Sequence, residues 1–170
     1  SGGAGEYRGG CGSTYRKQVL TPATIYTYVV GMKYPMPGIC GGMPGEPNRM
    51  VIRYGSADEY VVKHTADWVP IHAGERVMYD YGGGGGWGDP LDRPAALVAD
   101  DVAEGLISPL AARQLYGVVL RGNVSPDEGA TQRLRDRLRS ARSRTKSAAG
   151  TAKAKKTKKR PVRAKGRKRR

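Results

Sequence analysis

Residues 82–90 read Gly-Gly-Gly-Gly-Gly-Trp-Gly-Asp-Pro, and the chain changes character across this stretch. Before it, β-branched and aromatic residues form short runs between turns rich in glycine and proline, which is typical of strands joined by loops. After it, small and apolar residues recur at the spacing of amphipathic helices. The expected fold class is therefore α+β: a β-rich body of antiparallel strands over roughly residues 13–81, a small helical subdomain and a disordered basic tail.

The β-rich body is predicted from its strand-forming residues and its breakers. Residues 13–30 should form two strands with a turn at Thr21-Pro22. Residues 31–48 contain four prolines and five glycines, which disfavour both a helix and an interior strand, so a shaped loop is expected there. Further strands are predicted at residues 50–54, 60–63 and 76–81.

Two short helices are predicted directly after the glycine-rich stretch. Residues 94–105 carry apolar side chains at helical spacing, with a proline where a first helical residue would stand. Ser108 followed by Pro109 combines a capping side chain with a first-turn proline, and we expect this second helix to run through Leu115. Residues 116–120, Tyr-Gly-Val-Val-Leu, read as a strand.

A third helix is predicted from a capping-box pattern at residues 125–128, Ser-Pro-Asp-Glu. Ser125 stands at the cap and Glu128 follows three residues later, so each side chain can satisfy a free amide at the helix start. The helix behind it places small and apolar residues on one face, with arginines between them. That face consists of Ala130, Leu134, Leu138 and Ala141.

The 170-residue chain has a formal net charge of +15, but the charge is unevenly distributed. Residues 1–130 carry 11 basic and 14 acidic side chains, whereas residues 131–170 carry 19 basic side chains and one acidic side chain. This distribution excludes a uniformly basic globule that coats nucleic acid. Residues 144–170 have almost no large apolar side chain, so burial cannot offset a backbone entropy of roughly 1–2 kcal/mol per residue, and disorder is expected.

The predicted organisation is a single region over residues 1–143, β-rich to residue 90 and mainly helical over 91–143, followed by the tail. The tail leaves two interpretations open. Its charges can displace counterions from a polyanion, giving salt-dependent binding without sequence preference, or it can be a solubilising or partner-tethering extension. The candidate polyanion-binding residues are Lys153, Lys155, Lys156, Lys158, Lys159, Arg160, Arg163, Lys165, Arg167, Lys168, Arg169 and Arg170.

The glycine run is the most conspicuous local motif. Gly83, Gly85 and Gly88 satisfy the pattern G-x-G-x-x-G, but a dinucleotide-binding loop also needs a helix to begin at the last glycine, and Asp89-Pro90 follows instead. A need for positive φ or for close backbone approach is the preferred interpretation. Nucleotide binding, or closure over a ligand or partner, remains an alternative. The candidate functional loop, expected to shape an interface or a substrate entrance, consists of Gly82, Gly83, Gly84, Gly85, Gly86, Trp87, Gly88 and Asp89.

No metal site is predicted from the residues themselves. Cys11, Cys40, His64 and His72 lack the paired spacing of zinc ligands, so structural or surface roles are expected for them. Both thiols are expected to be reduced, with a single Cys11–Cys40 disulfide as the alternative. No apolar run approaches the roughly 18 residues that a membrane-spanning helix needs.

The acidic residues after the glycine run are expected to have structural rather than catalytic roles. Asp89 and Asp92 should cap the helix that follows and balance its dipole. A solvated helix face is expected for Asp100, Asp101 and Glu104.

Four motifs in a fixed order carry a family resemblance. They are SGGAGEYRGG at residues 1–10, GGMPG at 41–45, HAGERV at 72–77 and GGGGGWGDPLDRP at 82–94. In this order they resemble the SGGAGxYRGG, GGxPG and GDxV…GGGGYGDPLxRxP segments of the hydantoinase B/oxoprolinase family. The similarity continues in register through residues 98–109 and 111–120, so that it covers about residues 1–140 and leaves out the tail.

This resemblance implies part of an ATP-dependent hydrolase acting on cyclic amides of the hydantoin or 5-oxoproline type. In that family a B-type subunit works with an A-type subunit, which binds ATP and activates the substrate by phosphorylation, and a metal-bound water then attacks. ATP and a divalent metal are thus expected in the complete enzyme. Neither is expected on this chain, because the family's Asp/His metal ligands lie upstream of the matched stretch.

Family B-type subunits are also much longer than this chain. The resemblance therefore implies a C-terminal portion, from a split subunit or a fragment, that assembles in the cytoplasm with the A-type subunit and the missing N-terminal portion. It should contribute assembly or site shape and be inactive alone; Glu75 stands where the family often has Asp. Two alternatives stay open: a subunit of a related ATP-dependent ketone carboxylase, and a nucleic-acid-associated protein acting through its tail.

Overall fold

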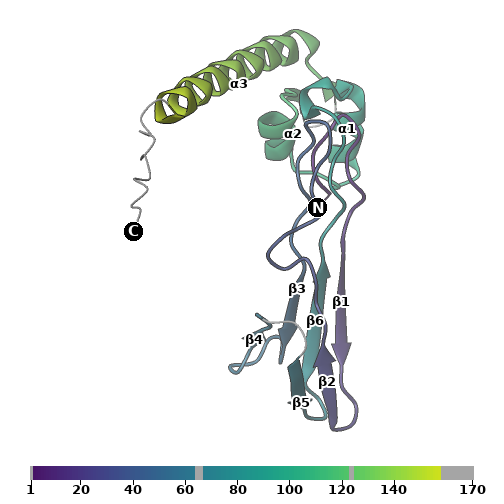
Figure 1. The fold of residues 1–170 in the computed structure, drawn as a ribbon. Coiled ribbons are helices and arrows are strands. Elements are labelled where there is room, and N and C mark those ends of the chain that lie inside the picture. The colour runs from purple at the N-terminus through teal and green to yellow at the C-terminus, as the bar shows by residue number, and fades with distance from the viewer. Residues whose placement is uncertain (1, 64–66, 123–124, 158–170) are drawn as a thin grey trace, which may run out of the picture.

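The structure is a computed structural model that describes residues 2–63, 67–122 and 125–157. The molecule is elongated, with strands at one end, glycine-rich segments in the middle and helices at the other end (Figure 1). Antiparallel strands come first along the chain and helices follow, which confirms the α+β class predicted from the sequence.

Within the described residues, the strands form three small antiparallel sheets. The four-stranded sheet has the order β1-β6-β3-β4, while β2 pairs with β5 and β7 pairs with β8. Strand β6 is central: its Tyr81 lies opposite Ser13, and its Asp80 lies opposite Arg49 on the other side. The strand bounds are β1 (Ser13–Gln18), β2 (Ala23–Thr27), β3 (Arg49–Ile52), β4 (Tyr60–Val61), β5 (Asp67–Ile71), β6 (Arg76–Tyr81), β7 (Leu120–Arg121) and β8 (Ser125–Pro126).

Most of the predicted strands are confirmed, and residues 31–48 form the expected shaped loop, with an isolated bridge at Ile39. Strand β5 was not predicted, because Pro70 removes a backbone donor from its middle. In a two-stranded sheet both strands are edges, so the position lacking an N–H can face away from the partner. Accordingly Pro70 lies opposite Thr24 without breaking the pairing.

Two separate hydrophobic cores lie at the two ends of the molecule. The strand end buries Val29, Met50, Ile52, Val62, Ile71 and Val77. The helical end buries Ala4, Ala95, Val98, Ala112, Tyr116 and Val118. The middle of the molecule, where the glycine-rich segments run, is therefore held by something other than packed apolar side chains.

The helical part contains η1 (Pro90–Asp92), α1 (Ala95–Ala103), α2 (Pro109–Leu115) and α3 (Glu128–Thr157). The first two predicted helices are confirmed as α1 and α2, with Pro94 one position earlier than expected, at the cap of α1. The Ser108 hydroxyl accepts a hydrogen bond from the Ala111 amide (3.1 Å), as its capping role requires. Within the described residues, no helix is both long enough and apolar enough to cross a membrane.

The strand predicted at residues 116–120 is wrong for most of its length. Gly117 has a φ of +64°, which turns the chain and places Val118 in the helical core, so that only Leu120 of the five residues lies in a strand. A glycine in the left-handed region interrupts this apolar run, which forms a buried turn here rather than a strand.

The capping-box prediction is also wrong in its residues. Ser125 pairs with Arg121 in β8, and the cap passes to Asp127, whose Oδ1 accepts from the Ala130 amide at 3.0 Å. Asp127 sits directly before the first helical residue, where a carboxylate satisfies a free amide and favours the positive end of the helix dipole.

Helix α3 continues beyond residue 143, the predicted boundary of the tail, and ends at Thr157. Alanine, lysine and arginine have high helix propensity, so a segment too polar to build a core can still hold helical backbone. The remainder of the predicted tail, residues 158–170, lies outside the described residues.

Candidate functional site

The glycine run is the central segment of a bundle of extended backbones. The Gly3 amide donates to the Gly84 carbonyl (2.8 Å), and the Gly84 amide donates to the Gly10 carbonyl (3.0 Å). On another side, the Gly86 amide donates to the Met43 carbonyl and the Ile39 amide donates to the Gly86 carbonyl, both at 2.9 Å. We call residues 2–12, 36–46 and 82–88 together the glycine bundle.

Close backbone approach explains why the run is made of glycine. A Cβ atom on Gly82 would overlap the carbonyl oxygen of Glu46, and one on Gly85 would overlap the carbonyl oxygen of Pro37. Gly84 differs, because a Cβ atom there would meet only the Gly10 nitrogen, at an ordinary 3.6 Å. The preferred interpretation of the run, close backbone approach, is confirmed, and positive φ is needed within it only at Gly88 (φ +75°).

The amides of the run are largely committed to protein oxygens. Beside Gly84 and Gly86, the Trp87 and Gly88 amides donate to the carbonyls of Tyr7 and Ile39, and the Gly82 amide donates to Oδ1 of Asn48 (2.7 Å). A phosphate-binding loop needs free amides that converge on the ligand. This geometry argues against nucleotide binding by the run and for a structural role at the centre of the bundle.

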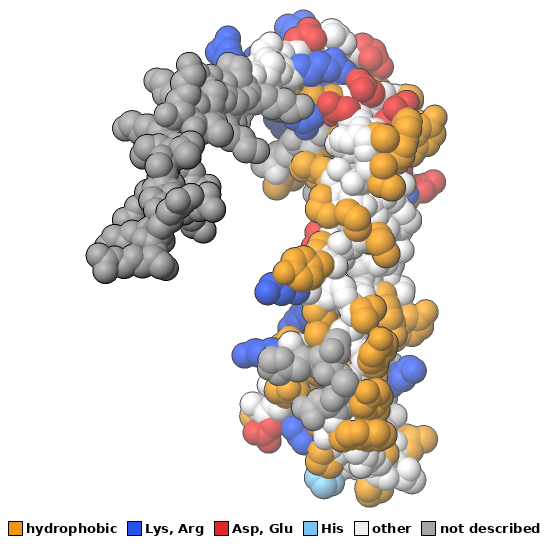
Figure 2. All heavy atoms as spheres, in the orientation of Figure 1, with side chains coloured by type: hydrophobic (Ala, Val, Ile, Leu, Met, Phe, Trp, Pro, Cys, Tyr) orange, Lys and Arg blue, Asp and Glu red, His pale blue; other side chains and the backbone are white. Residues whose placement is uncertain are grey.

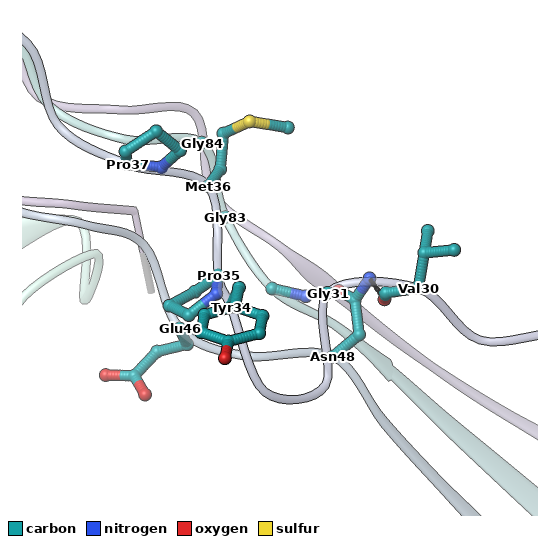
Figure 3. Close-up of a pocket in the computed structure, with 11 residues that line it drawn as sticks. Val30, Gly31, Tyr34, Pro35, Met36, Pro37, Glu46, Asn48, Gly83 and Gly84 are labelled. Atoms are coloured by element: carbon teal, nitrogen blue, oxygen red, sulfur yellow. Dashed lines mark hydrogen bonds between the residues drawn. The ribbon is translucent and has the colours of Figure 1, made fainter. Parts of the chain in front are cut away.

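An open cleft of about 430 Å³ runs along the outer side of the bundle. Tyr34, Pro35, Met36 and Pro37 form one wall, and the backbone of Gly82, Gly83 and Gly84 forms the floor (Figure 3). Asn48 closes one end and is fixed there, because its side-chain amide donates to the Val30 carbonyl (2.7 Å) while its oxygen accepts from Gly82. Of the candidate functional loop, these three glycines line this cleft.

Asp89 lies where the chain leaves the bundle, and it caps η1. Its Oδ1 accepts from the Leu91 amide (2.9 Å) and from Nη1 of Arg142 (2.8 Å). Partial burial opposes ionisation, but these two donors outweigh it and lower the pKa of Asp89. The predicted capping role of Asp89 is confirmed, whereas Asp92 pairs with Arg139 (2.7 Å).

Helix α3 docks on this exit through three arginines on one face. Besides Arg142 and Arg139, Arg135 donates from Nε to the Tyr116 carbonyl (3.1 Å) and from Nη2 to the Arg93 carbonyl (2.6 Å). Carbonyls and carboxylates of residues 89–93 thus receive most of these contacts. The C-terminal helix is held to the end of the glycine run mainly by polar bonds.

A buried charge cluster was missed by the sequence analysis, which expected Asp101 on a solvated helix face. Asp101 is only 6% exposed and pairs with Arg93 (2.9 Å) and Arg8 (3.4 Å). Arg93 also donates to the Glu6 carbonyl (3.1 Å), so the cluster ties α1 to the N-terminal segment of the bundle. The overlooked signal is register: Asp101 follows the buried Val98 by three positions on the same helix face.

Two further groups adjoin this cluster. Burial works against the charged form of Arg8, but Asp101 and the Cys11 sulfur, which accepts from Arg8 Nη1 (3.0 Å), raise the pKa of Arg8. Burial raises the pKa of Tyr116, whose hydroxyl has no hydrogen-bond partner among the described residues. The arrangement fixes α1 and α2 against residues 6–11.

The possible metal ligands do not converge. Cys11 and Cys40 are free and exposed, and His72 is exposed in a turn where its backbone amide donates to Glu75 (2.9 Å). His64 lies outside the described residues. Over the part of the chain that the structure describes, no three His, Cys, Asp or Glu residues are grouped so that they could hold a metal ion.

Glu75, the position at which the family often has Asp, is part of a structural turn. It accepts from the His72 amide and from Nε of Arg53 (3.1 Å). The hydrogen bond from the His72 amide has the largest effect and lowers the pKa of Glu75. Arg53 lowers this pKa further, and the two effects together outweigh partial desolvation, which raises it.

Three comparisons place the chain among known proteins. The hydantoinase B/oxoprolinase family matches residues 1–90. Caprolactamase subunit beta of Pseudomonas jessenii is 41% identical over an alignment of 138 residues that covers 77% of this chain and 23% of that protein. The acetone carboxylase alpha subunit of Xanthobacter autotrophicus is 26% identical over an alignment of 181 positions, gaps included, which covers 84% of this chain and 23% of that subunit.

The crystal structure of ATP-dependent caprolactamase from Pseudomonas jessenii matches with a TM-score of 0.61 at 36% identity, over 78% of this chain and 24% of that chain. The chain therefore spans about a quarter of the length of the relatives that it matches. Every segment of the glycine bundle lies within the matched residues 1–90. The chain belongs to the hydantoinase B/oxoprolinase family.

Proposed function

We propose that this chain is the C-terminal part of a B-type subunit in an ATP-dependent hydrolase of cyclic amides, of the hydantoin or 5-oxoproline type. The observation that carries the proposal is its 36% identity to the ATP-dependent caprolactamase structure over 78% of its length. Its role is to shape and assemble the enzyme, with an A-type subunit and the remaining N-terminal portion of the B-type subunit as partners.

The glycine bundle supports a shaping role. Side chains cannot enter at Gly82 or Gly85 without displacing a neighbouring backbone, so the bundle has little freedom to adjust. The bundle therefore keeps the cleft along residues 82–84 in a fixed position and shape. A rigid support of this kind keeps a substrate entrance or a subunit interface in a fixed geometry.

Exposed aromatic side chains support an assembly role. Hydrophobic side chains gather along one edge of the strand-bearing end (Figure 2). Tyrosine and tryptophan are enriched at protein interfaces, and exposed apolar patches of this kind mark contact surfaces. In the proposal this edge faces the rest of the B-type subunit. The exposed aromatic residues of the strand end include Tyr15, Tyr26, Tyr28, Trp68 and Tyr81.

Cyclic amides resist hydrolysis because resonance stabilises the carbonyl. In the proposed system ATP supplies the phosphoryl group that makes the amide oxygen a good leaving group, and a divalent metal supplies the attacking water. The described residues do not form a metal site, and the amides of the glycine run are largely occupied. We therefore assign neither phosphoryl transfer nor water attack to this chain, and we assign it the role of supporting the site.

A related ketone carboxylase is the second candidate. The observation favouring it is the similarity to the acetone carboxylase alpha subunit, which extends over 84% of this chain. The hydrolase is preferred because the identity to caprolactamase subunit beta is higher, 41% against 26%.

The test is a replacement experiment. The matching segment of the Pseudomonas jessenii caprolactamase subunit beta is exchanged for this chain, and ATP-dependent lactam hydrolysis by the complex is measured. The hybrid should retain activity, the isolated chain should have none, and a complex lacking the segment should be inactive. A soluble, assembled hybrid without activity contradicts the proposal, as does ATP-dependent hydrolysis by the purified chain alone.

A further inference from the structure

The arginines of α3 divide into two sets on opposite faces of the helix. Arg135, Arg139 and Arg142 are the docking set, and each donates to a carbonyl or carboxylate of the body, as described above. Arg133, Arg137 and Arg144 are exposed, and none of them forms an ion pair with any described residue. We call the second set the outer arginines.

Helix geometry places the two sets almost opposite each other. At about 100° per residue, positions 133, 137 and 144 fall within roughly 40° of one another, and they lie roughly 180° from the docking positions. Two members of the docking set also form ion pairs, Arg139 with Asp92 and Arg142 with Asp89. The body thereby neutralises the docking face of α3, whereas on the other face the positive charge is offset only beside Arg133, which lies close enough to Asp127 to lower the pKa of that carboxyl.

We propose that the outer face of α3 binds the phosphate backbone of nucleic acid. This inference is independent of the proposed enzymatic function. Guanidinium groups bind phosphate oxygens in a bidentate manner and remain charged at all physiological pH values. No aromatic side chain occurs anywhere in residues 128–170, so base stacking contributes nothing and binding is insensitive to sequence.

Length and charge favour a nucleic acid over an acidic protein surface. The 30 residues of α3 extend for about 45 Å. The positive charge continues along the sequence, with 19 basic side chains and one acidic side chain in residues 131–170. A continuous array of this kind suits a polymer that carries one negative charge per about 1.7 Å of its length, as duplex DNA does.

The test measures the affinity of the full chain for a random-sequence duplex DNA by fluorescence anisotropy across salt concentrations. The triple variant Arg133→Gln, Arg137→Gln, Arg144→Gln should lower affinity at least about fivefold at low salt. It should reduce the slope of log K against log salt by about 2–3, since each lost phosphate contact removes about 0.9. Glutamine is a good helix former, and circular dichroism verifies that α3 is retained.

The matched control removes the same charge from the strand end. The variant Arg16→Gln, Lys17→Gln, Arg76→Gln changes three exposed cations of β1 and β6 and should leave the affinity and the salt slope unchanged within twofold. An equal loss in both triple variants, or no loss in the outer-arginine variant, overturns the proposal. Polyglutamate that competes as well as DNA at equal charge also overturns it, in favour of an acidic protein partner. A parallel titration with a single-stranded RNA of the same charge distinguishes RNA from duplex DNA as the nucleic acid that the helix binds.

Discussion

At the scale of single residues, the glycine run is a set of positions with different tolerances. Gly82, Gly83, Gly85 and Gly86 each face the carbonyl oxygen of another segment, whereas Gly84 faces open space and one nitrogen. The sequence Gly-Gly-Gly-Gly-Gly is uniform, but the packing around it is not.

Alanine at position 85 should therefore destabilise the protein strongly, while alanine at position 84 should not. The Gly85→Ala variant must displace the Pro37 carbonyl, which we expect to cost about 3 kcal/mol of unfolding free energy. Gly84→Ala should stay within about 0.5 kcal/mol of the native protein. Urea unfolding followed by circular dichroism checks both values, and equal effects at the two positions would contradict the bundle geometry.

Asp101 and Asp100 form a second matched pair of neighbouring residues. Asp101→Asn leaves Arg8 and Arg93 without their carboxylate in a buried site, and the expected loss is about 3 kcal/mol. Asp100 is exposed on the other side of α1, so Asp100→Asn should change stability by less than about 0.5 kcal/mol. Thermal unfolding of both variants decides whether the cluster supports the helical end.

At the scale of secondary-structure elements, α3 is fixed by polar contacts more than by an apolar face. Leu134 and Leu138 are only partly buried, and the docking arginines supply the specific bonds to residues 89–93. A helix attached in this way should respond to pH, because one of its acceptors, Asp89, is a carboxylate that can be protonated.

The direction of this response follows from the lowered pKa of Asp89. A carboxylate whose pKa is lower in the folded state stabilises that state above its unfolded pKa, about 4, and this stabilisation is lost as the pH falls through the folded value. The pH dependence of stability below about pH 4 should be weaker in Asp89→Asn than in the native protein. Urea midpoints at pH 6 and pH 3 measure this pH dependence, with Asp136→Asn as the control. An unchanged pH dependence in Asp89→Asn would show that ionised Asp89 does not stabilise the folded protein.

The elements also show where sequence reasoning succeeds and where it stops. Strand β6 and helix α2 were predictable because each carries a strong local signal, a short run of apolar and aromatic residues in β6 and a Ser-Pro cap in α2. Strand β5 was not, since its Pro70 is tolerated only where that position can face away from the partner strand, which depends on the pairing with β2. The burial of Asp101 depends on Arg8, 93 residues away in sequence, and no local pattern reports such a pairing.

At the scale of the whole molecule, two small cores are joined by backbone packing. The strand end and the helical end each bury their own apolar side chains, and the glycine bundle between them transmits their relative position. The glycine-rich motifs that reveal the family are also the segments of this bundle. We infer that the bundle supplies the fixed geometry through which the chain supports the proposed enzyme.

The most direct test of that claim combines the replacement experiment with the paired glycine variants. ATP-dependent lactam hydrolysis is measured for three hybrid caprolactamase complexes, carrying the native chain, Gly84→Ala or Gly85→Ala in place of the matching segment. We expect activity with the native chain and with Gly84→Ala, and at least a tenfold loss with Gly85→Ala. An inactive but assembled native hybrid, or a Gly85→Ala hybrid as active as the native one, would contradict it.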